Sequence, residues 1–330
     1  PEKQAAAEIH RLLKYPGFLK RDVFAKGRTE SVELKIDADS KLCGVSLIEM
    51  NGMLKRRVLV CAVLRDGNAI VPGGHFRLQA GDRIFVTAPT ENLAALLKGL
   101  GIITHRVKYC LLCGGGTVAY YLADMLRKSG IKTRIIEDDA ARCAELCELL
   151  PDADISCGDC GDMEVLEQEG LTDYDAIVTM TGHDELNMIA SLYAGSQKVP
   201  QVITKIADKG SNTIINSLGL GSVICPKELC CNDIIRYVRA MQNQTGAALS
   251  VHAIADGQVE ALEFLVDANT ENCGIPLKQL KTKPNVLIAS IGHGSKTEIP
   301  NGDSVFQQGD SMVVIASGRG SIRQINDIFA

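Results

Sequence analysis

The 330-residue chain has no tryptophan, and aromatic residues make up only 4% of it. It also lacks any apolar run that approaches the roughly 18 residues of a transmembrane helix, and its first residues, PEKQ, are not those of a signal peptide. Charges of one sign form no long run, and the formal net charge is −5. The basic surface of a free-standing nucleic-acid-binding protein is therefore missing. These absences exclude a membrane-spanning segment and disfavour a nucleic-acid partner.

The cysteines lack the spacing of a zinc site. Cys110 and Cys113 form a CxxC inside an apolar segment that reads as a strand, where their side chains point to opposite faces. Cys157 and Cys160 form a second CxxC, with no His or Cys pair nearby at zinc-ribbon spacing. We therefore expect no metal site and reduced, structural thiols of a cytoplasmic protein. The twelve cysteines are Cys43, Cys61, Cys110, Cys113, Cys143, Cys147, Cys157, Cys160, Cys225, Cys230, Cys231 and Cys273.

An internal repeat organises the chain. Residues 58–86 and 286–314 align without a gap at an offset of 228, with Pro72 opposite Pro300 and Gly81-Asp82 opposite Gly309-Asp310. Each copy is predicted to contain a strand (Val32–Asp37 or Ala261–Asp267), a short helix, three more strands and a closing helix (Glu91–Gly99 or Gly320–Phe329). Alternating hydrophobicity in Val58–Leu64 and Val286–Ile291 predicts half-buried strands. Each copy is thus a small α+β module of about 80 residues, and an amphipathic helix of about 14 residues begins at Pro1 and at Pro226.

Between the modules the pattern changes to alternating strands and helices, which is typical of a parallel sheet covered by helices on both faces. The predicted strands are Val107–Cys113, Thr133–Glu137, Ala153–Cys157, Asp175–Met180, Val202–Ile206 and Ser222–Cys225. The predicted helices are Thr117–Lys128, Asp139–Leu149, Met163–Glu169, Asp184–Ser196 and Ser211–Leu218. The fold class is therefore α/β, a doubly wound Rossmann domain flanked by two small α+β domains.

The first strand of this unit leads directly into Gly114-Gly115-Gly116-Thr117-Val118-Ala119, a G-x-G-x-x-A pattern. Gly114 permits the tight turn, Gly116 lets a pyrophosphate approach the backbone, and Ala119 keeps the helix close to the sheet. Free N–H groups at the helix start then hold the phosphates. An acid, Glu137, ends the second strand 21 residues after Gly116. This combination predicts a nucleotide site.

Glu137 also indicates which nucleotide binds. A carboxylate at this place accepts hydrogen bonds from the adenosine ribose and repels a 2′-phosphate, so NADP is disfavoured. Asp138 and Asp139 are good N-cap residues for the next helix. Asp184 is expected to be an N-cap as well, and His183 an exposed loop residue.

Ligands of such sheets lie beyond the carboxyl ends of the strands, so the loops after the later strands complete the site. Gly158 and Asp159 are expected to face the adenine, Thr181 the second half of the nucleotide, and Lys205 the phosphate charge. The candidate binding residues are Gly114, Gly115, Gly116, Thr117, Val118, Ala119, Glu137, Gly158, Asp159, Thr181 and Lys205.

A catalytic role is not indicated. Short-chain dehydrogenases carry Tyr with Lys four residues later, and none of the seven tyrosines has Lys at that spacing. The segment after the Rossmann unit is a copy of the module that precedes it, not a separate catalytic domain. We therefore expect no catalytic residues and a nucleotide sensor.

The sequence resembles the cytoplasmic regulatory subunits of bacterial and archaeal Trk potassium uptake systems, the TrkA family, whose units are called RCK or KTN domains. The resemblance rests on the glycine loop CGGGTVA, the acid in IIE (Glu137), the CGD after the third strand, TGHDELN (Thr181–Asn187), and the module segment Arg65–Asp82. It covers nearly the whole chain. The second module carries His293 in place of Arg65, and Thr117 stands where the family often has Arg or another long polar residue.

The resemblance implies a domain organisation. Residues 1–17 are the end of a truncated first RCK N domain, 18–101 the first RCK C domain, 106–226 the Rossmann RCK N domain, 227–247 a crossover helix and linker, and 248–330 the second RCK C domain. The chain is thus expected to lack its first Rossmann core.

The resemblance also implies a function: a ring-forming cytoplasmic protein, peripheral on the inner face of the membrane, that gates a membrane-embedded potassium translocator of the Trk type. NAD or NADH is the expected ligand, with ATP or ADP as the alternative. Two other functions stay open: an NAD-dependent oxidoreductase, and a nucleotide-sensing subunit of another cation channel or antiporter.

Overall fold

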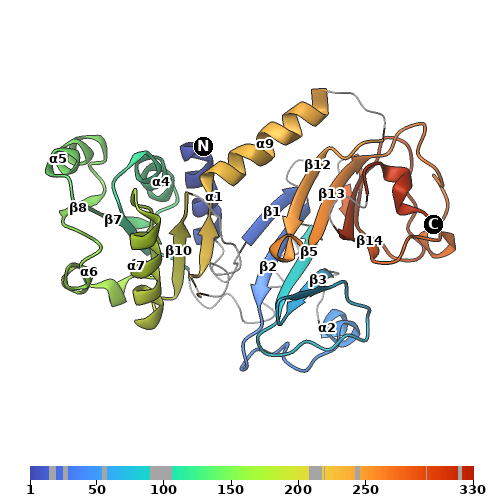
Figure 1. The fold of residues 1–330 in the computed structure, drawn as a ribbon, viewed down its shortest axis with the longest axis horizontal. Helices are drawn as coiled ribbons and strands as arrows, with labels where there is room; N and C mark the ends of the chain where they lie inside the picture. The colour runs from blue at the N-terminus through green and yellow to red at the C-terminus, as the bar shows by residue number, and fades with distance from the viewer. Residues whose placement is uncertain are drawn as a thin grey trace. The chain divides into compact units, whose positions relative to one another are not determined.

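The computed structural model describes residues 1–14, 20–24, 29–53, 58–89, 106–207, 218, 220–241, 246–294, 296–318 and 322–330. The chain divides into two compact units (Figure 1). The Rossmann unit comprises Pro1–Lys20 and Ile103–Cys231, and the module unit comprises Arg21–Ile102 and Asn232–Ala330. We describe each unit by itself.

The Rossmann unit alternates strands and helices as the sequence predicts. Its helices are α1 (Glu2–Lys14), α4 (Thr117–Lys128), α5 (Ala140–Leu149), α6 (Met163–Gln168), the 3₁₀ turn η2 (Leu171–Asp173), α7 (Asp184–Ser196) and the start of α9 (Pro226–Met241). Its strands are β6 (Tyr109–Cys113), β7 (Lys132–Glu137), β8 (Asp154–Cys157), β9 (Ala176–Thr179), β10 (Gln201–Lys205) and β11 (Ser222–Ile224). The predicted helix Ser211–Leu218 lies outside the described residues except for Leu218.

The six strands form one parallel sheet in the order β11-β10-β9-β6-β7-β8. The chain moves outward from β6 through β7 to β8, then returns to β9 on the other side of β6. Helices α4 and α5 cover one face of the sheet, and α6 and α7 cover the other (Figure 1). The strand order therefore reverses between β6 and β9, where ligands of doubly wound sheets bind.

Helix α1 packs against α4 in the Rossmann unit. Its apolar residues recur with helical spacing and are fully buried on one side, among them Ile9 and Leu12 at 0% and 1% exposure. The Gln201 side chain donates to the Leu12 carbonyl at 3.0 Å, and His10 hydrogen bonds Ser129 at 2.7 Å. Helix α1 is therefore part of the same compact unit as the parallel sheet.

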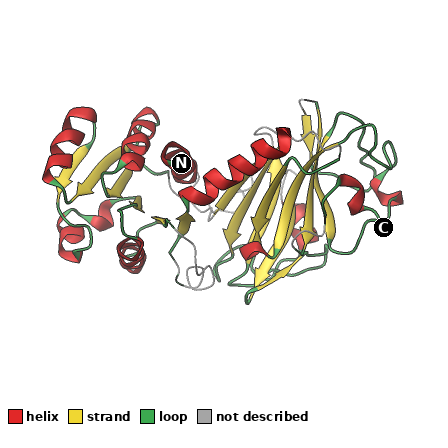
Figure 2. Ribbon diagram, turned by 45° about the horizontal axis from the view of Figure 1, so that its top comes forward, coloured by secondary structure: helices red, strands yellow, loops and turns green. Residues whose placement is uncertain are grey.

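The module unit consists mainly of strands, whereas helices flank the sheet of the Rossmann unit (Figure 2). The first module contains β1 (Lys20–Phe24), β2 (Thr29–Lys35), α2 (Leu47–Met53), β3 (Leu59–Arg65), β4 (Asn68–Ile70) and β5 (Arg83–Pro89). The second contains β12 (Ser250–Ile254), η3 (Ala255–Gly257), β13 (Val259–Leu265), η4 (Leu277–Gln279), β14 (Val286–His293), β15 (Lys296–Glu298), β16 (Ser311–Ser317) and η5 (Ile325–Ile328).

The two modules have the same strand order. It is β1-β2-β5-β3-β4 in the first and β12-β13-β16-β14-β15 in the second. The alignment of the repeat thus corresponds to a structural repeat. Strands β1 and β12 were not predicted, so each sheet has one strand more at its start than the sequence pattern indicated.

The modules pair with each other within the chain. Their facing strands share a hydrophobic cluster, in which Ala62 and Phe85 of the first module meet Ala289 and Ile315 of the second. Polar contacts extend this interface: the Gln258 side chain bonds both the Ala69 N–H and the Gly67 carbonyl, at 3.0 and 2.7 Å, and Arg83 pairs with Asp256 at 3.1 Å.

This pairing overturns one prediction. We expected Val58–Leu64 and Val286–Ile291 to be half-buried, but the middle of β3 and of β14 is buried on both faces. One face of each strand contacts its own module, and the other face contacts the opposite module: β3 faces the second module and β14 faces the first. Ala62 and Ala289 are both fully buried.

The repeated Gly-Asp pair has a structural role. Gly81 and Gly309 adopt φ values of +90° and +92°, which favour glycine. The aspartate after each glycine accepts the N–H three residues earlier: Asp82 from Gln79 at 2.8 Å, and Asp310 from Gln307 at 2.7 Å.

Each of these aspartates also pairs with a basic side chain at the end of a strand of the same sheet, β3 in the first module and β14 in the second. Arg65 donates to both oxygens of Asp82 at 2.7 Å, and His293 lies 2.8 Å from Asp310. The motif therefore ties a tight turn to β3 or β14.

The closing helices were predicted incorrectly or lie outside the described residues. Glu91–Gly99 is not described. Within the predicted helix Gly320–Phe329, the described residues 322–329 form only the 3₁₀ turn η5. Ile322, Ile325 and Ile328 are all buried, and their spacing of three residues suits a 3₁₀ turn. Isolated bridges at Gln324 and Phe329 hold both sides of this turn in extended conformation.

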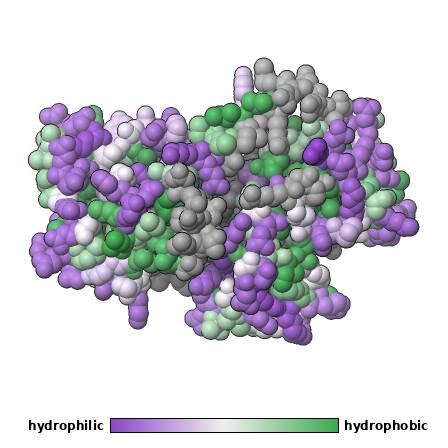
Figure 3. All heavy atoms as spheres, viewed as in Figure 1, coloured by the Kyte–Doolittle hydropathy of each residue, from purple (hydrophilic) through white to green (hydrophobic). Residues whose placement is uncertain are grey.

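No helix among the described residues is both long enough and apolar enough to cross a bilayer. The face drawn in Figure 3 carries mostly hydrophilic residues, with smaller hydrophobic areas between them.

Candidate functional site

The candidate site lies at the carboxyl ends of β6 and β9, where the strand order reverses. Gly114 follows β6 with φ +100°, and a Cβ on it would lie 3.0 Å from the Thr181 Cα. The loop after β9 therefore packs directly on the glycine loop. This position requires glycine both for its backbone conformation and for the close approach.

The start of α4 is open. No side chain caps it, and its N-cap residue is Gly116. A Cβ on Gly116 would meet nothing within 4 Å, so space lies beside the loop. Ala119 is fully buried, which keeps α4 against the sheet. An uncapped helix start with free space beside it suits a phosphate, because its N–H groups and the helix dipole favour an anion. The residues present thus fit a nucleotide pyrophosphate.

Glu137 reaches from the end of β7 into this loop. Its carboxylate accepts the Gly115 N–H at 2.5 Å and the Asp139 N–H at 3.1 Å. A Cβ on Gly115 would lie 2.5 Å from Leu146 and 3.0 Å from the Glu137 carboxylate, so glycine is needed here too. The acid therefore lies beside the glycine loop, as the spacing of 21 residues predicted.

Two neighbours of Glu137 support the loop. Asp139 caps α5, accepting from Ala141 N–H at 2.8 Å and Arg142 N–H at 3.3 Å, as predicted for an N-cap. The Arg142 side chain donates to the Gly115 carbonyl at 2.9 Å. Arg142 was not singled out from the sequence, because nothing in its local pattern reveals a contact with a loop 27 residues earlier.

The loop after β8 lies next to Glu137. The Gly158 N–H donates to the Glu137 carbonyl at 2.9 Å. The exposed Asp159 side chain accepts the Gly161 N–H at 2.7 Å, which shapes this loop. Gly158 and Asp159, which were predicted to face the adenine, thus lie beside Glu137 at the end of the site where the adenosine is predicted.

The Asn187 side chain links the ends of β9 and β10, where the predicted site residues Thr181 and Lys205 lie. This fully buried amide accepts from the Thr181 N–H and hydroxyl, both at 2.8 Å, and donates to the Thr181 and Lys205 carbonyls at 3.2 and 3.1 Å. It was quoted in the TGHDELN segment but not predicted as a site residue. Its partners lie at the ends of β9 and β10, and only the folded sheet brings these together.

Lys205 ends β10 and faces the same edge, where its ammonium donates to the Met180 carbonyl at 3.1 Å. Burial lowers the pKa of Lys205, and the nearby carboxylates of Asp184 and Glu2 partly oppose that shift. A cation held partly out of water gains most from an anionic partner, which is the role predicted for it.

Asp184 is not an N-cap, contrary to our expectation. His183 holds that position without a side-chain bond, and it is exposed as expected. Asp184 begins α7 and accepts the Ala207 N–H with both oxygens at 2.9 Å. This contact ties α7 to the segment after β10, which explains the acid at this position.

At this edge of the sheet lie the uncapped N–H groups of α4 with free space beside Gly116, the Glu137 carboxylate and the half-buried Lys205. Within the described ranges, no cluster of three His, Cys, Asp or Glu residues could hold a metal ion. The structure brings all the predicted site residues to one edge of the sheet.

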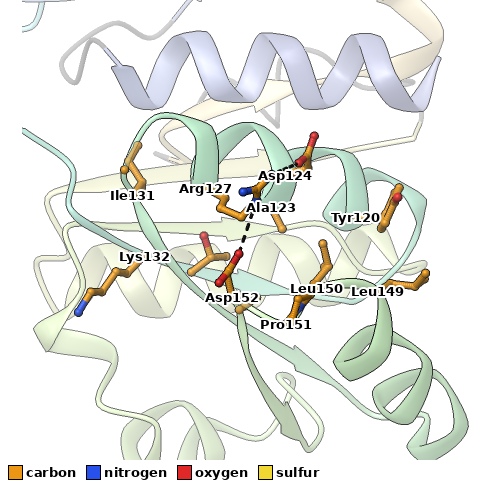
Figure 4. A pocket seen from close by; sticks show the side chains of 13 residues that line it. Tyr120, Ala123, Asp124, Arg127, Ile131, Lys132, Leu149, Leu150, Pro151 and Asp152 are labelled. Carbon is orange, nitrogen blue, oxygen red and sulfur yellow. Dashed lines mark hydrogen bonds and ion pairs between the residues drawn. The ribbon is translucent and has the colours of Figure 1, made fainter.

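A separate cavity of about 690 Å³ opens at the opposite edge, at the amino ends of β7 and β8 (Figure 4). Arg127 points toward Asp124 and Asp152 at its rim, at 3.1 and 3.8 Å. None of the predicted site residues lines it.

Comparison with known protein families gives two matches. The TrkA-N domain matches residues 110–226, and the TrkA-C domain matches residues 32–101 and 261–330. The first match covers the parallel sheet with the candidate site, and the second covers the two modules.

Curated relatives match across almost the whole chain. The Trk system potassium uptake protein TrkA homolog 1 of Methanosarcina mazei is 29% identical over 96% of this chain and 69% of its own length. The TrkA homolog of Archaeoglobus fulgidus is 28% identical over 100% of this chain and 72% of its own length. TrkA of Haemophilus influenzae is 27% identical over 100% and 71%. These relatives are named as potassium uptake proteins, not as enzymes, in agreement with the prediction of no catalytic role.

Solved structures share the fold. The GsuK RCK domain matches with a TM-score of 0.53 and 14% identity, over 96% of this chain and 67% of that one. The GsuK channel bound to NAD matches with a TM-score of 0.51 and 15% identity, over 96% and 56%. The predicted fold class, a Rossmann domain flanked by two RCK C-type domains, is confirmed.

Proposed function

Because the chain belongs to the TrkA family, we propose that it is a regulatory subunit that senses a nucleotide and gates a Trk-type potassium translocator. The observation that carries the proposal is the open start of α4 beside Glu137, at the point where the strand order reverses. That arrangement offers an anion site and a ribose acceptor side by side.

The proposed ligand is NAD or NADH, with ATP or ADP as the alternative. The pyrophosphate lies along Gly114, Gly115 and Gly116 at the first turn of α4, which also contains Thr117, Val118 and Ala119. Glu137 accepts from the adenosine ribose and repels a 2′-phosphate, which disfavours NADP. A protein with the same fold, the GsuK channel, has been solved with NAD bound, which supports this choice.

The two halves of the site suggest how occupancy is sensed. Gly158 and Asp159 border one end, while Thr181 and Lys205 border the other. A dinucleotide such as NAD is long enough to contact both ends of the site. ATP or ADP has a phosphate tail in place of the second nucleoside, so it makes different contacts with Thr181 and Lys205. A ligand shifts the gate only by its difference in affinity between two shapes, so ligands of unequal length can bias the gate in opposite directions. A coupling of about 1–3 kcal/mol gives a several-fold to hundredfold response.

The proposed partners are a membrane-embedded potassium translocator and further copies of the protein in a ring. In this proposal the protein works in the cytoplasm and associates peripherally with the inner face of the membrane through the translocator. The proposed domain division keeps residues 106–226 as the sensor and the two modules as the parts that transmit its state.

The test has two parts. Purified protein is titrated with NADH, NAD, ATP, ADP and NADP by calorimetry, and we expect binding of at least one of the first four and weaker binding of NADP. Potassium flux is then measured in liposomes that hold the cognate translocator, with the protein as its gene encodes it. The proposal is overturned if the potassium flux changes neither when the protein is added nor when any of the four nucleotides is added. Turnover of NADH with candidate substrates would favour an oxidoreductase, and co-purification with another channel or antiporter would favour that partner.

A further inference from the structure

The segment Cys157-Gly158-Asp159-Cys160 forms the loop after β8, and each of its two cysteines faces a cysteine from another element. The Cys157 thiol interacts with Cys143 of α5, and the Cys160 thiol interacts with Cys113 at the end of β6. The loop that borders the candidate ribose site therefore has a thiol pair at each end. From the sequence alone these four cysteines were expected to be reduced, structural thiols.

The first pair, Cys143 and Cys157, lies beside Glu137. The Cys143 thiol donates to the Glu137 carbonyl at 3.3 Å, and Cys157 is the residue opposite Glu137 in the β7–β8 register. Both cysteines thus lie beside Glu137, the last residue of β7. They differ in exposure: Cys143 is only 8% exposed, whereas Cys157 is open to solvent.

We propose that Cys143 and Cys157 form a redox-modification site, in which a hydroperoxide oxidises the exposed Cys157 and the two cysteines then join in a disulfide. The Cys157 thiolate attacks one peroxide oxygen, the O–O bond breaks, and a sulfenic acid forms. The hydroxide that leaves takes up the proton that the Cys157 thiol had released, which gives the first water. The Cys143 sulfur then attacks the sulfenic sulfur, and the hydroxide that leaves takes up the Cys143 proton as a second water. One peroxide accepts two electrons, and two thiols become one disulfide.

The roles of the two cysteines follow from their surroundings. Burial, together with the neighbouring Cys157 thiol, raises the pKa of Cys143 to about 12, so Cys143 stays a thiol and acts second. Peroxide reaches Cys157 first because only this cysteine of the pair is exposed.

The second pair is an internal control. Cys113 is fully buried and Cys160 is 5% exposed. The hydrogen bond with Cys160 and burial raise the pKa of Cys113 well above its usual range, while the same contact lowers the pKa of Cys160. Because peroxide cannot reach either sulfur in the folded protein, this pair stays reduced under conditions that oxidise the first.

The disulfide acts on the candidate site through Glu137. It removes the S–H donor from the Glu137 carbonyl and ties the first turn of α5 to the end of β8. The Glu137 carboxylate is held by N–H groups of Gly115 and of Asp139, the α5 cap, so a shift of α5 moves it. This consequence rests on the proposed function: nucleotide affinity falls on the order of fivefold on oxidation.

The first experiment reads the disulfide alone. Purified protein is treated with hydrogen peroxide, free thiols are blocked with N-ethylmaleimide, and the products are analysed by intact mass and peptide mapping. We expect the loss of two hydrogen atoms and a Cys143–Cys157 peptide, which dithiothreitol reverses. Cys143→Ser and Cys157→Ser each abolish the cross-link, whereas Cys147→Ser and Cys113→Ser retain it. A disulfide at other cysteines, or Cys157 oxidised to sulfinic acid with no cross-link, overturns the proposal.

The second experiment measures NADH affinity before and after oxidation, for the parent and for Cys143→Ser. The affinity of the parent should fall and recover with dithiothreitol, and that of the variant should not change. A disulfide that forms without altering affinity overturns the coupling to the site. If the disulfide forms but no nucleotide binds in either state, the proposed function fails while the modification site stands.

Discussion

Replacing Glu137 by alanine tests the nucleotide site most directly. In the free protein its carboxylate accepts N–H groups of Gly115 and Asp139 at 2.5 and 3.1 Å. A bound adenosine ribose offers hydroxyl donors to the same oxygens. The alanine variant loses the proposed ribose acceptor and leaves the Gly115 N–H without its carboxylate partner.

The magnitude comes from the cost of an unpaired buried polar group, about 1–3 kcal/mol. At about 1.4 kcal/mol for each factor of ten, we expect the Kd of NAD(H) or ATP to rise by about fivefold to 150-fold. The fold should persist, because Glu137 ends its strand and the backbone pairing of β7 with β8 does not need the side chain.

The assay is isothermal calorimetry with NAD, NADH, ATP and NADP on the parent and on Glu137→Ala. Glu148→Ala is the matched control, since it removes an exposed carboxylate from α5, the helix that follows Glu137. Its affinity should equal that of the parent. Two results would refute the reasoning: equal affinity of the parent for NAD and NADP, or unchanged affinity of Glu137→Ala.

Three further predictions concern the loop, the amide bridge and the repeated turn. Gly116→Val should abolish nucleotide binding but keep the melting temperature, whereas Gly114→Val should unfold the domain. Of the two glycines, only Gly114 has a positive φ and backbone atoms 3.0 Å from the position of a Cβ. Calorimetry and thermal melts measure the two effects, and two variants that behave alike would contradict the prediction. Asn187→Ala should lower stability by about 2–4 kcal/mol, because it leaves several buried groups unpaired; a urea midpoint equal to that of the parent would argue against the bridge. Asp82→Asn should cost about 3 kcal/mol through loss of the Arg65 pair. Burial raises the pKa of Asp82, but the hydrogen bonds from Arg65 and the Gln79 N–H outweigh burial and lower the pKa. The stabilisation by Asp82 is therefore present above about pH 4 and is lost as pH falls through the pKa of the folded state. The unfolding free energies of parent and variant should converge below that pH, and a constant difference between them at all pH values would refute this.

The sequence predicted the Rossmann sheet well because its signals are local. The glycine loop, the apolar strand before it and the acid after the next strand all occur within about 30 residues, the size of one βαβ unit. Helices α4 and α7 begin and end at the predicted residues.

The features that the sequence did not reveal depend on contacts between distant segments. Strand β3 reads as half-buried because its alternating pattern cannot show that a second module covers its other face. Asn187 looks like an ordinary helical polar residue until the Lys205 carbonyl is placed beside it. The pairing of Cys143 with Cys157 likewise appears only when α5 folds back onto β8.

Because the two modules pair within one chain, their association does not depend on the protein concentration. Two separate copies of such a module would associate according to their concentration, and they would come apart when the protein is scarce. Here a single chain carries both partners, so each meets the other at an effective concentration set by the tether rather than by expression level. The face shared by Ala62, Phe85, Ala289 and Ile315 is therefore covered in every molecule, even in one that has met no other subunit. Contacts that would build the proposed ring must then use other surfaces.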